Sequence, residues 1–179
     1  MSVPRFAWAI TGSGHYIVEC VELMLSLPNV DLYVSQAGEE VLKMYDIPLA
    51  DLKARLPVYR DKAASAPPVG LFYKHVYHTF VMAPTTSNTM AKCVLGIADS
   101  LVTNLYAQAG KCRVSSIVYP CDTAAEILTT APGGKQVMVY PRPVDLAATE
   151  ALRAFPYTRV VDDVEALAEA LRQRLAALA

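Results

Sequence analysis

The stretch from Val81 to Thr103 constrains the fold more than any other part of the chain. The apolar run Thr79–Ala83 is long enough for a buried strand, and we expect Pro84 to end it. Five small polar residues and then a helical pattern follow. This order predicts a strand, a polar turn and a helix N-terminus, which is where ligands bind in an open α/β sheet. An ordinary turn with a serine or asparagine cap is the alternative.

A second unit of the same kind opens the chain. Arg5–Thr11 predicts a buried strand, Gly12, Ser13 and Gly14 form a turn, and a helix is expected from about His15 to Leu27. Glycines allow close approach, and helix N–H groups donate to phosphate. The turn is not a complete GxGxxG motif and no Walker lysine follows it, so a tight structural turn is the alternative.

The rest of the chain alternates short apolar runs with helical patterns. Strands are expected at Val30–Val34, Arg113–Tyr119 and Thr158–Val161, and helices at Gly38–Tyr45, Leu49–Leu56, Asp145–Ala154 and from Asp162 or Asp163 onward. The helix after the polar turn is expected to continue to Ala109 and stop at Gly110. A loop is expected at residues 60–68, and Glu126–Val139 predicts a β-hairpin. We therefore expect one α/β domain over residues 1–179, Rossmann-like (flavodoxin-like), with three layers, a mostly parallel sheet and a small hairpin.

Composition narrows the class of protein. Hydrophobic residues make up 54% of the chain, yet no apolar run reaches the roughly 18–20 residues of a membrane helix. We expect the surplus apolar surface to face other subunits. The net charge of −1 gives no reason to expect nucleic acid as a partner.

The cysteines and the N-terminus bear on the compartment. Cys20, Cys93, Cys112 and Cys121 are scattered without CxxC spacing, which argues against zinc and against a disulfide framework. This usage favours a reducing cytoplasm and no metal site. The first strand runs straight into the glycine turn, so no signal peptide is expected.

Two linked motifs carry a family resemblance. Pro84–Thr89 reads PTTSNT, and Gly96–Leu101 reads GIADSL. The homo-oligomeric flavin-containing cysteine decarboxylase superfamily carries Pro-Ala-Ser-Ala-Asn-Thr, a helix and Gly-Ile-Ala-Asp-Asn-Leu-Leu at matching spacing, and this chain resembles it. The resemblance implies an FMN cofactor and a homo-oligomer, trimer or dodecamer, with flavin sites near subunit contacts.

The resemblance also implies roles for the polar turns. It places Gly12, Ser13, Gly14 and Ser35 on the phosphate and ribityl chain, although Ser35 could equally cap the next helix. It places the ribityl chain and ring in contact with Pro84, Thr85, Thr86, Ser87, Asn88 and Thr89. The Asn88 amide can both donate to and accept from the polar edge of a flavin.

The chain departs from the decarboxylases at two positions. The decarboxylases carry a catalytic histidine about fourteen residues before the proline of the turn. In this chain the corresponding position is Gly70. His75 and His78 lie several residues away from the position of the catalytic histidine, and we interpret them as structural or surface residues. The decarboxylase Pro-Xaa-Met-Asn clamp is replaced by Pro120–Thr123 (PCDT). Both departures argue against decarboxylation.

Taken together, the motifs ITGSGH, APTTSNT, GIADSL and YPCDT, followed by a PGGK hairpin, are similar to a narrower branch. This is the dihydromethanopterin reductase (acceptor) and archaeal flavoprotein branch. It implies an FMN-dependent oxidoreductase that delivers hydride from reduced FMN to dihydromethanopterin or a related dihydropterin, giving the tetrahydro form. The electron donor would be NAD(P)H or a redox protein.

The proton donor for this reaction stays open between His15 and Asp122. Asp122 could instead bind N–H groups of a pterin ring, or cap a helix or turn. The alternative functions are a cysteine decarboxylase, a prenyltransferase and a non-catalytic flavin electron carrier.

Overall fold

The computed structural model describes residues 5–63 and 65–178. Its main sheet has the strand order β3-β2-β1-β4-β5-β8, and every neighbouring pair is parallel. The strands are β1 (Arg5–Ile10), β2 (Val30–Val34), β3 (Val58–Arg60), β4 (Tyr77–Thr85), β5 (Ser115–Pro120) and β8 (Thr158–Val160). A separate antiparallel hairpin is formed by β6 (Ile127–Thr130) and β7 (Gln136–Val139). The predicted three-layer α/β fold with a parallel sheet and a hairpin is confirmed.

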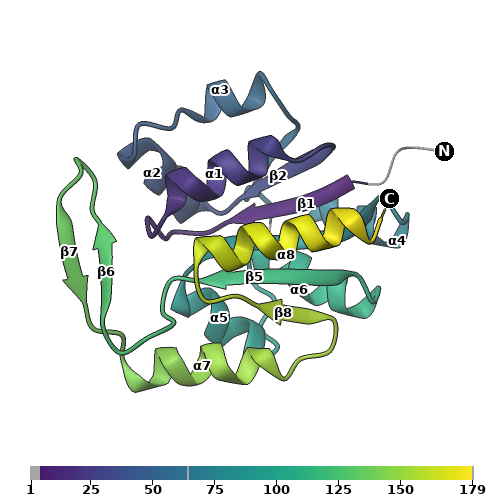
Figure 1. The fold of residues 1–179 in the computed structure, drawn as a ribbon. Helices are drawn as coiled ribbons and strands as arrows, with labels where there is room; N and C mark the ends of the chain where they lie inside the picture. Colours follow the sequence, from purple (N-terminus) through teal and green to yellow (C-terminus); the bar gives the residue numbers. More distant parts are fainter. Residues whose placement is uncertain (1–4, 64, 179) are drawn as a thin grey trace.

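Helices cover both faces of the sheet (Figure 1). The first face is covered by α1 (Ile17–Ser26), α2 (Gln36–Met44), α3 (Leu49–Lys53) and α8 (Val164–Ala176). The second is covered by the 3-10 turn η1 (Pro67–Val69), α4 (Gly70–Tyr73), α5 (Ser87–Val94), α6 (Leu101–Lys111) and α7 (Pro143–Arg153). Because β1 lies between two such layers, Phe6 and Trp8 pack into one core cluster while Ala7 and Ala9 pack into the other. No helix within the described residues is long and apolar enough to cross a membrane.

The strand order reverses next to β1. From β1 the chain moves outward to β2 and β3, then returns to place β4 on the other side of β1. The loops that follow β1 and β4 therefore leave in opposite directions and open a crevice at the carboxyl ends of these strands. The two polar turns found in the sequence are these loops.

The prediction that Pro84 ends its strand is wrong. β4 continues through Pro84 to Thr85, and the Ala83–Pro84 peptide bond is cis. The register between β4 and β5 shifts between Met82 and Thr85. A proline fits at such an irregularity because its missing N–H removes no regular ladder hydrogen bond.

The prediction of one continuous helix after the polar turn is also wrong, since the chain forms α5 and α6 with a break between them. Gly96 takes the left-handed conformation, with φ of 72°. The Ile97 N–H donates to the Lys92 carbonyl at 2.8 Å, and the Gly96 N–H donates to the Cys93 carbonyl at 3.2 Å. This is a Schellman motif, which ends a helix at a glycine. Ser100 then starts α6 with a capping box.

Several smaller boundaries differ from the expectation. The third strand β3 and the start of η1 lie in a region predicted to be irregular, and the short helix α4, which follows it, was not predicted. The first helix starts at Ile17 rather than His15, because Tyr16 takes a left-handed conformation. Helix α2 starts at Gln36, α6 continues to Lys111, and α7 starts at Pro143 with Asp145 in its first turn. The last helix was expected to start at Asp162 or Asp163, and Asp163 is its N-cap.

Candidate functional site

A cleft of about 580 Å³ opens at the point where the strand order reverses. Its walls come from the turn after β1, the start of α2, the segment after β3, the start of α5 and the α5–α6 connection. The lining residues are Thr11, Gly12, Ser35, Gln36, Ala37, Asp61, Lys62, Ala63, Thr86, Asn88, Thr89, Lys92, Asp99 and Ser100. Five of these were predicted from the sequence, namely Gly12, Ser35, Thr86, Asn88 and Thr89.

Three helix N-termini meet at this cleft. Ser35 caps α2, Thr86 caps α5 and Ser100 caps α6, and each side chain accepts a hydrogen bond from the first turn of its own helix. All three caps line the cleft. Helix N-termini carry partial positive charge and spare N–H donors, so the arrangement suits an anion such as a phosphate group. The cap of α5 is a threonine, rather than the serine or asparagine considered from the sequence.

Thr11 joins the two polar turns. Its buried Oγ1 donates to the Pro84 carbonyl at 3.0 Å and accepts from the Thr86 N–H at 2.8 Å. The end of β1 is thereby fixed against the start of α5. The sequence pattern predicted Thr11 only as the end of a strand, and this role was not predicted.

Close approach at Gly12 shapes the floor of the cleft. A Cβ atom at Gly12 would lie 2.7 Å from the Cβ of Ala37, and one at Gly38 would lie 2.8 Å from the Ile10 carbonyl oxygen. The first turn of α2 can therefore pack directly on the end of β1 only because these positions lack side chains.

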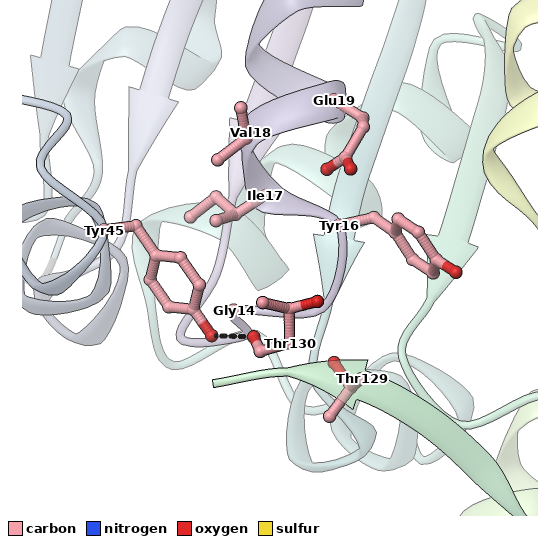
Figure 2. A pocket seen from close by; sticks show the side chains of 8 residues that line it. All are labelled: Gly14, Tyr16, Ile17, Val18, Glu19, Tyr45, Thr129 and Thr130. Carbon is pink, nitrogen blue, oxygen red and sulfur yellow. Dashed lines mark hydrogen bonds between the residues drawn. The ribbon is translucent and has the colours of Figure 1, made fainter. Parts of the chain in front are cut away.

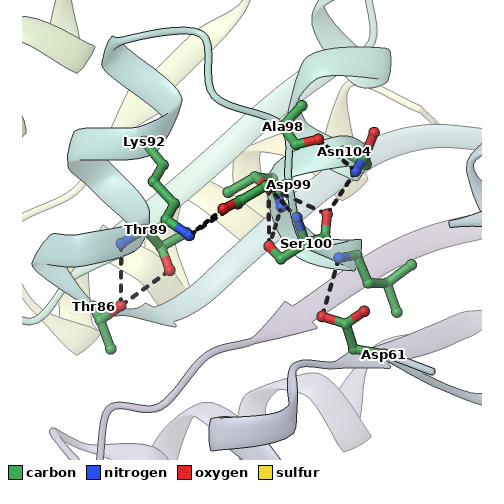
Figure 3. Close-up of polar contacts among 10 residues, drawn as sticks. Asp61, Thr86, Thr89, Lys92, Ala98, Asp99, Ser100 and Asn104 are labelled. Atoms are coloured by element: carbon green, nitrogen blue, oxygen red, sulfur yellow. Dashed lines mark hydrogen bonds and ion pairs between the residues drawn. The ribbon is translucent and has the colours of Figure 1, made fainter. Parts of the chain in front are cut away.

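The α5–α6 connection supplies a charged rim (Figure 3). The Lys92 ammonium pairs with the Asp99 carboxylate at 2.7 Å. The Asp61 carboxylate accepts from the Leu101 N–H at 3.1 Å and so joins the segment after β3 to the start of α6. Asp61, Lys92 and Asp99 were not among the predicted site residues. The GIADSL motif contains Asp99, but its spacing alone assigned no contact to that residue.

The other predicted cofactor residues do not line the cleft. Pro84 and Thr85 are buried within β4, and the Thr85 hydroxyl donates to the Met82 carbonyl at 2.7 Å. Ser13 and Gly14 lie in the turn after β1, and Ser87 is the first residue of α5. Their contacts with a cofactor stay predictions.

Asp122 lies on the other side of the first turn of α5. Its carboxylate accepts a hydrogen bond from the Ser87 hydroxyl. Its backbone carbonyl accepts from the Thr149 hydroxyl of α7 at 2.9 Å. Residues from β4–α5, β5 and α7 therefore meet here, and we call Ser87, Asp122 and Thr149 the Asp122 corner.

His15 lies near the Asp122 corner and contacts the hairpin. Its Nδ1 is 2.9 Å from the Thr129 hydroxyl of β6. Burial lowers the pKa of His15 below its usual value, and the nearby Asp122 and Glu19 carboxylates oppose this shift. The imidazole is therefore held mainly in its neutral form near pH 7.

A small cavity of about 110 Å³ separates the start of α1 from the hairpin (Figure 2). Across it, the Tyr45 hydroxyl of the α2 C-terminus donates to the Thr130 carbonyl at 2.7 Å. With the His15 contact, this bond fixes β6 beside the glycine turn.

His75 and His78, which are near the position of the decarboxylases' catalytic histidine, lie at the opposite end of β4 from the cleft. His75 is exposed before β4, and His78 is the second residue of that strand, whereas the cleft is at its carboxyl end. The interpretation of both as structural or surface residues agrees with this placement.

Comparisons with known proteins give a consistent family. The family model described as Flavoprotein matches residues 1–177. An uncharacterized protein of Methanocaldococcus jannaschii is 38% identical over 90% of both chains. Proteins named dihydromethanopterin reductase (acceptor) from Methanosarcina mazei and M. jannaschii are each 40% identical, over 74% and 70% of this chain. The matched parts make up 61% and 56% of those two reductases, so this chain spans less than two thirds of their length.

Solved structures agree with the fold. DmrB of Burkholderia xenovorans, described in complex with FMN as a cubic protein cage for redox transfer, is 46% identical, with a TM-score of 0.91. That match covers 98% of this chain and 97% of DmrB. A phenylacrylic acid decarboxylase from Aquifex aeolicus has a TM-score of 0.69 at 17% identity over 97% of both chains, a likeness of fold alone.

Proposed function

Because this chain belongs to the flavoprotein family, we propose that it is an FMN-dependent oxidoreductase that reduces dihydromethanopterin or a related dihydropterin to the tetrahydro form. The observation that carries the proposal is the convergence of three helix N-termini on one cleft beside a glycine turn. Relatives of this chain are named for that reaction.

The residues around the cleft fit FMN. Gly12 and Ser35 line the cleft where the N-termini of α2 and α5 offer backbone N–H groups. These two residues would therefore hold the phosphate. Thr86, Asn88 and Thr89 would hold the ribityl chain and the polar edge of the ring. Asn88 is exposed, so its amide is free to turn toward a ligand.

The chemistry divides between cofactor and protein. Bound FMN supplies the hydride, and the protein supplies position and electrostatics. Reduction of a C=N bond also needs one proton on the nitrogen. Asp122, which contacts the first turn of α5, and His15, which contacts β6, are the two candidates for delivering it.

We further propose that the protein acts as a homo-oligomer and takes electrons from NAD(P)H or a redox protein. Exposed large apolar residues, including Leu95, Ile97 and Tyr140, would be covered by neighbouring copies. Structural neighbours are described as a cubic cage and as a dodecamer. A monomer by light scattering would contradict this assembly.

The experiment that tests the reaction uses purified protein loaded with FMN. We expect about one FMN per chain, identified after release, and turnover of a dihydropterin with at least one of several electron donors. Failure to reduce any dihydropterin with every donor tried would overturn the reductase proposal while leaving FMN binding intact.

A further inference from the structure

The Asp122 corner contains a carboxylate that the cofactor contacts proposed above do not use. Asp122 is the second residue after β5, and Ser87 is the first residue of α5. The next residues of that helix, Asn88 and Thr89, line the cofactor cleft. The carboxylate therefore contacts the same first turn of α5 that lines the cleft.

Two elements fix the position of this carboxylate. The Ser87 hydroxyl donates to Oδ2, and the Thr149 hydroxyl holds the Asp122 backbone from α7. In the parts of the chain that the structure describes, Asp122 takes part in no ion pair. A carboxylate has about four acceptor sites, and the Ser87 hydroxyl uses only one of them. The Cys121 thiol also lies within hydrogen-bonding reach of the Asp122 side chain. The other acceptors of this half-exposed group are available to donors on a ligand.

A pterin ring offers matching donors. Its 2-amino-4-oxopyrimidine edge presents a ring N–H and an exocyclic amino N–H side by side, in the same parallel arrangement as the fork of a guanidinium group. A carboxylate accepts such a pair with two parallel, strong hydrogen bonds. The edge of a flavin instead has one N–H between two carbonyl groups, and a carboxylate facing those carbonyls is repelled.

We infer that Asp122, held by Ser87, binds the amino-pyrimidinone edge of the pterin and sets the substrate specificity of the enzyme. The inference rests on the proposed function, because it assigns a role within that reaction. It makes Ser87 a positioning residue, since its hydroxyl is engaged by Asp122.

The test is a binding measurement on the oxidised FMN-loaded protein, in which no turnover occurs. We expect wild-type protein to bind pterin in a calorimeter and to bind a pterin analogue without the 2-amino group far more weakly. Asp122→Asn, which replaces an acceptor by a donor, should weaken pterin binding about 10- to 100-fold, the usual range for a charge-assisted pair. The preference for the amino group should disappear in this variant.

Three controls separate this role from others. Glu126→Gln removes the same charge from an exposed position in the following connection and should leave pterin binding unchanged. In Asp122→Asn, KM for dihydropterin should rise more than kcat falls, and this loss should be larger than any loss of rate with ferricyanide, an acceptor without the amino edge. Ser87→Ala should show a smaller loss of the same kind, and Asp122→Glu a partial recovery.

The outcomes are distinguishable. Equal binding of pterin and its desamino analogue by wild-type protein would overturn the inference without any variant, even if Asp122→Asn fails to fold. Unchanged pterin affinity in Asp122→Asn, or an equal loss with ferricyanide, would also overturn it. If wild-type holoprotein binds no pterin at all, the proposed function fails first and the inference falls with it.

Discussion

Gly12 lies in the turn after β1 and packs closely against α2. A Cβ atom there would lie 2.7 Å from the Ala37 Cβ, and both residues line the cleft. Overpacking of this kind costs about 1–3 kcal/mol, which the free protein can avoid by moving the turn away from α2. Binding of FMN at this wall of the cleft would require the turn to return, and a loss of about 1.4 kcal/mol in binding is a tenfold change in affinity. We therefore predict that Gly12→Ala raises the dissociation constant for FMN about tenfold in a fluorescence titration.

Gly110 provides the matched control for this substitution. Nothing lies within 4 Å of a Cβ atom built at Gly110, which is in the helix α6. Gly110→Ala should leave FMN binding unchanged and stabilise the fold by up to about 1 kcal/mol. Equal FMN affinity in both variants would show that the turn at Gly12 is not part of the flavin site.

Residues that line the cleft were predictable where a local sequence pattern marks the turn that contains them. The small polar turn pointed to Thr86, Asn88 and Thr89 because a strand, a turn and a helix start follow one another in the sequence. Asp61 was missed because its partner, the Leu101 N–H, is forty residues away in the chain. No local spacing records a contact of that kind.

At the scale of elements, Thr11 joins the end of β1 to the start of α5. Its hydroxyl bridges the Pro84 carbonyl and the Thr86 N–H and is 1% exposed. We predict that Thr11→Val, of the same shape, destabilises the fold by about 1–3 kcal/mol, because a buried N–H loses its acceptor. The measurement is urea unfolding, with FMN binding followed in parallel.

Thr11→Ser keeps the hydroxyl and is the control. It should restore most of the FMN affinity that Thr11→Val loses. Thr11→Val with wild-type stability and wild-type FMN affinity would mean that the two turns do not depend on this bridge.

The elements that sequence patterns predicted least well are those that depend on packing or on pairing with other strands. The residues after the polar turn keep a helical spacing of apolar side chains, so the break between α5 and α6 at Gly96 was not predicted. A glycine followed by Ser-x-x-Thr is nevertheless a sequence signal for such a break. A proline usually ends a strand, but the irregular pairing of β4 with β5 accommodates Pro84. The strand β3 has only three residues, too few to show a period.

At the scale of the whole molecule, the pKa of His78 couples stability to pH. Burial and then the Arg174 charge lower this pKa to about 4. Arg174 Nε donates to the Thr79 hydroxyl at 2.8 Å, and Thr79 Oγ1 lies 2.7 Å from His78 Nδ1. The Thr79 hydroxyl is thus free to donate to a neutral imidazole.

The unfolded chain therefore binds a proton at His78 that the folded protein does not bind between about pH 6.5 and pH 4. Stability from this residue is complete above that window and is lost as the pH falls through it. We predict that His78→Gln flattens the fall in unfolding free energy between pH 7 and pH 5, relative to wild type in the same buffers. An unchanged slope would contradict the assignment.

The most direct test of the whole account is a single-turnover experiment that needs no natural electron donor. The FMN-loaded protein is reduced chemically without oxygen and mixed with a dihydropterin, and the absorbance of oxidised flavin is followed. We expect the oxidised flavin to return, with one tetrahydropterin formed per flavin. Flavin that stays reduced with every dihydropterin, while ferricyanide oxidises it, would contradict a dihydropterin reductase.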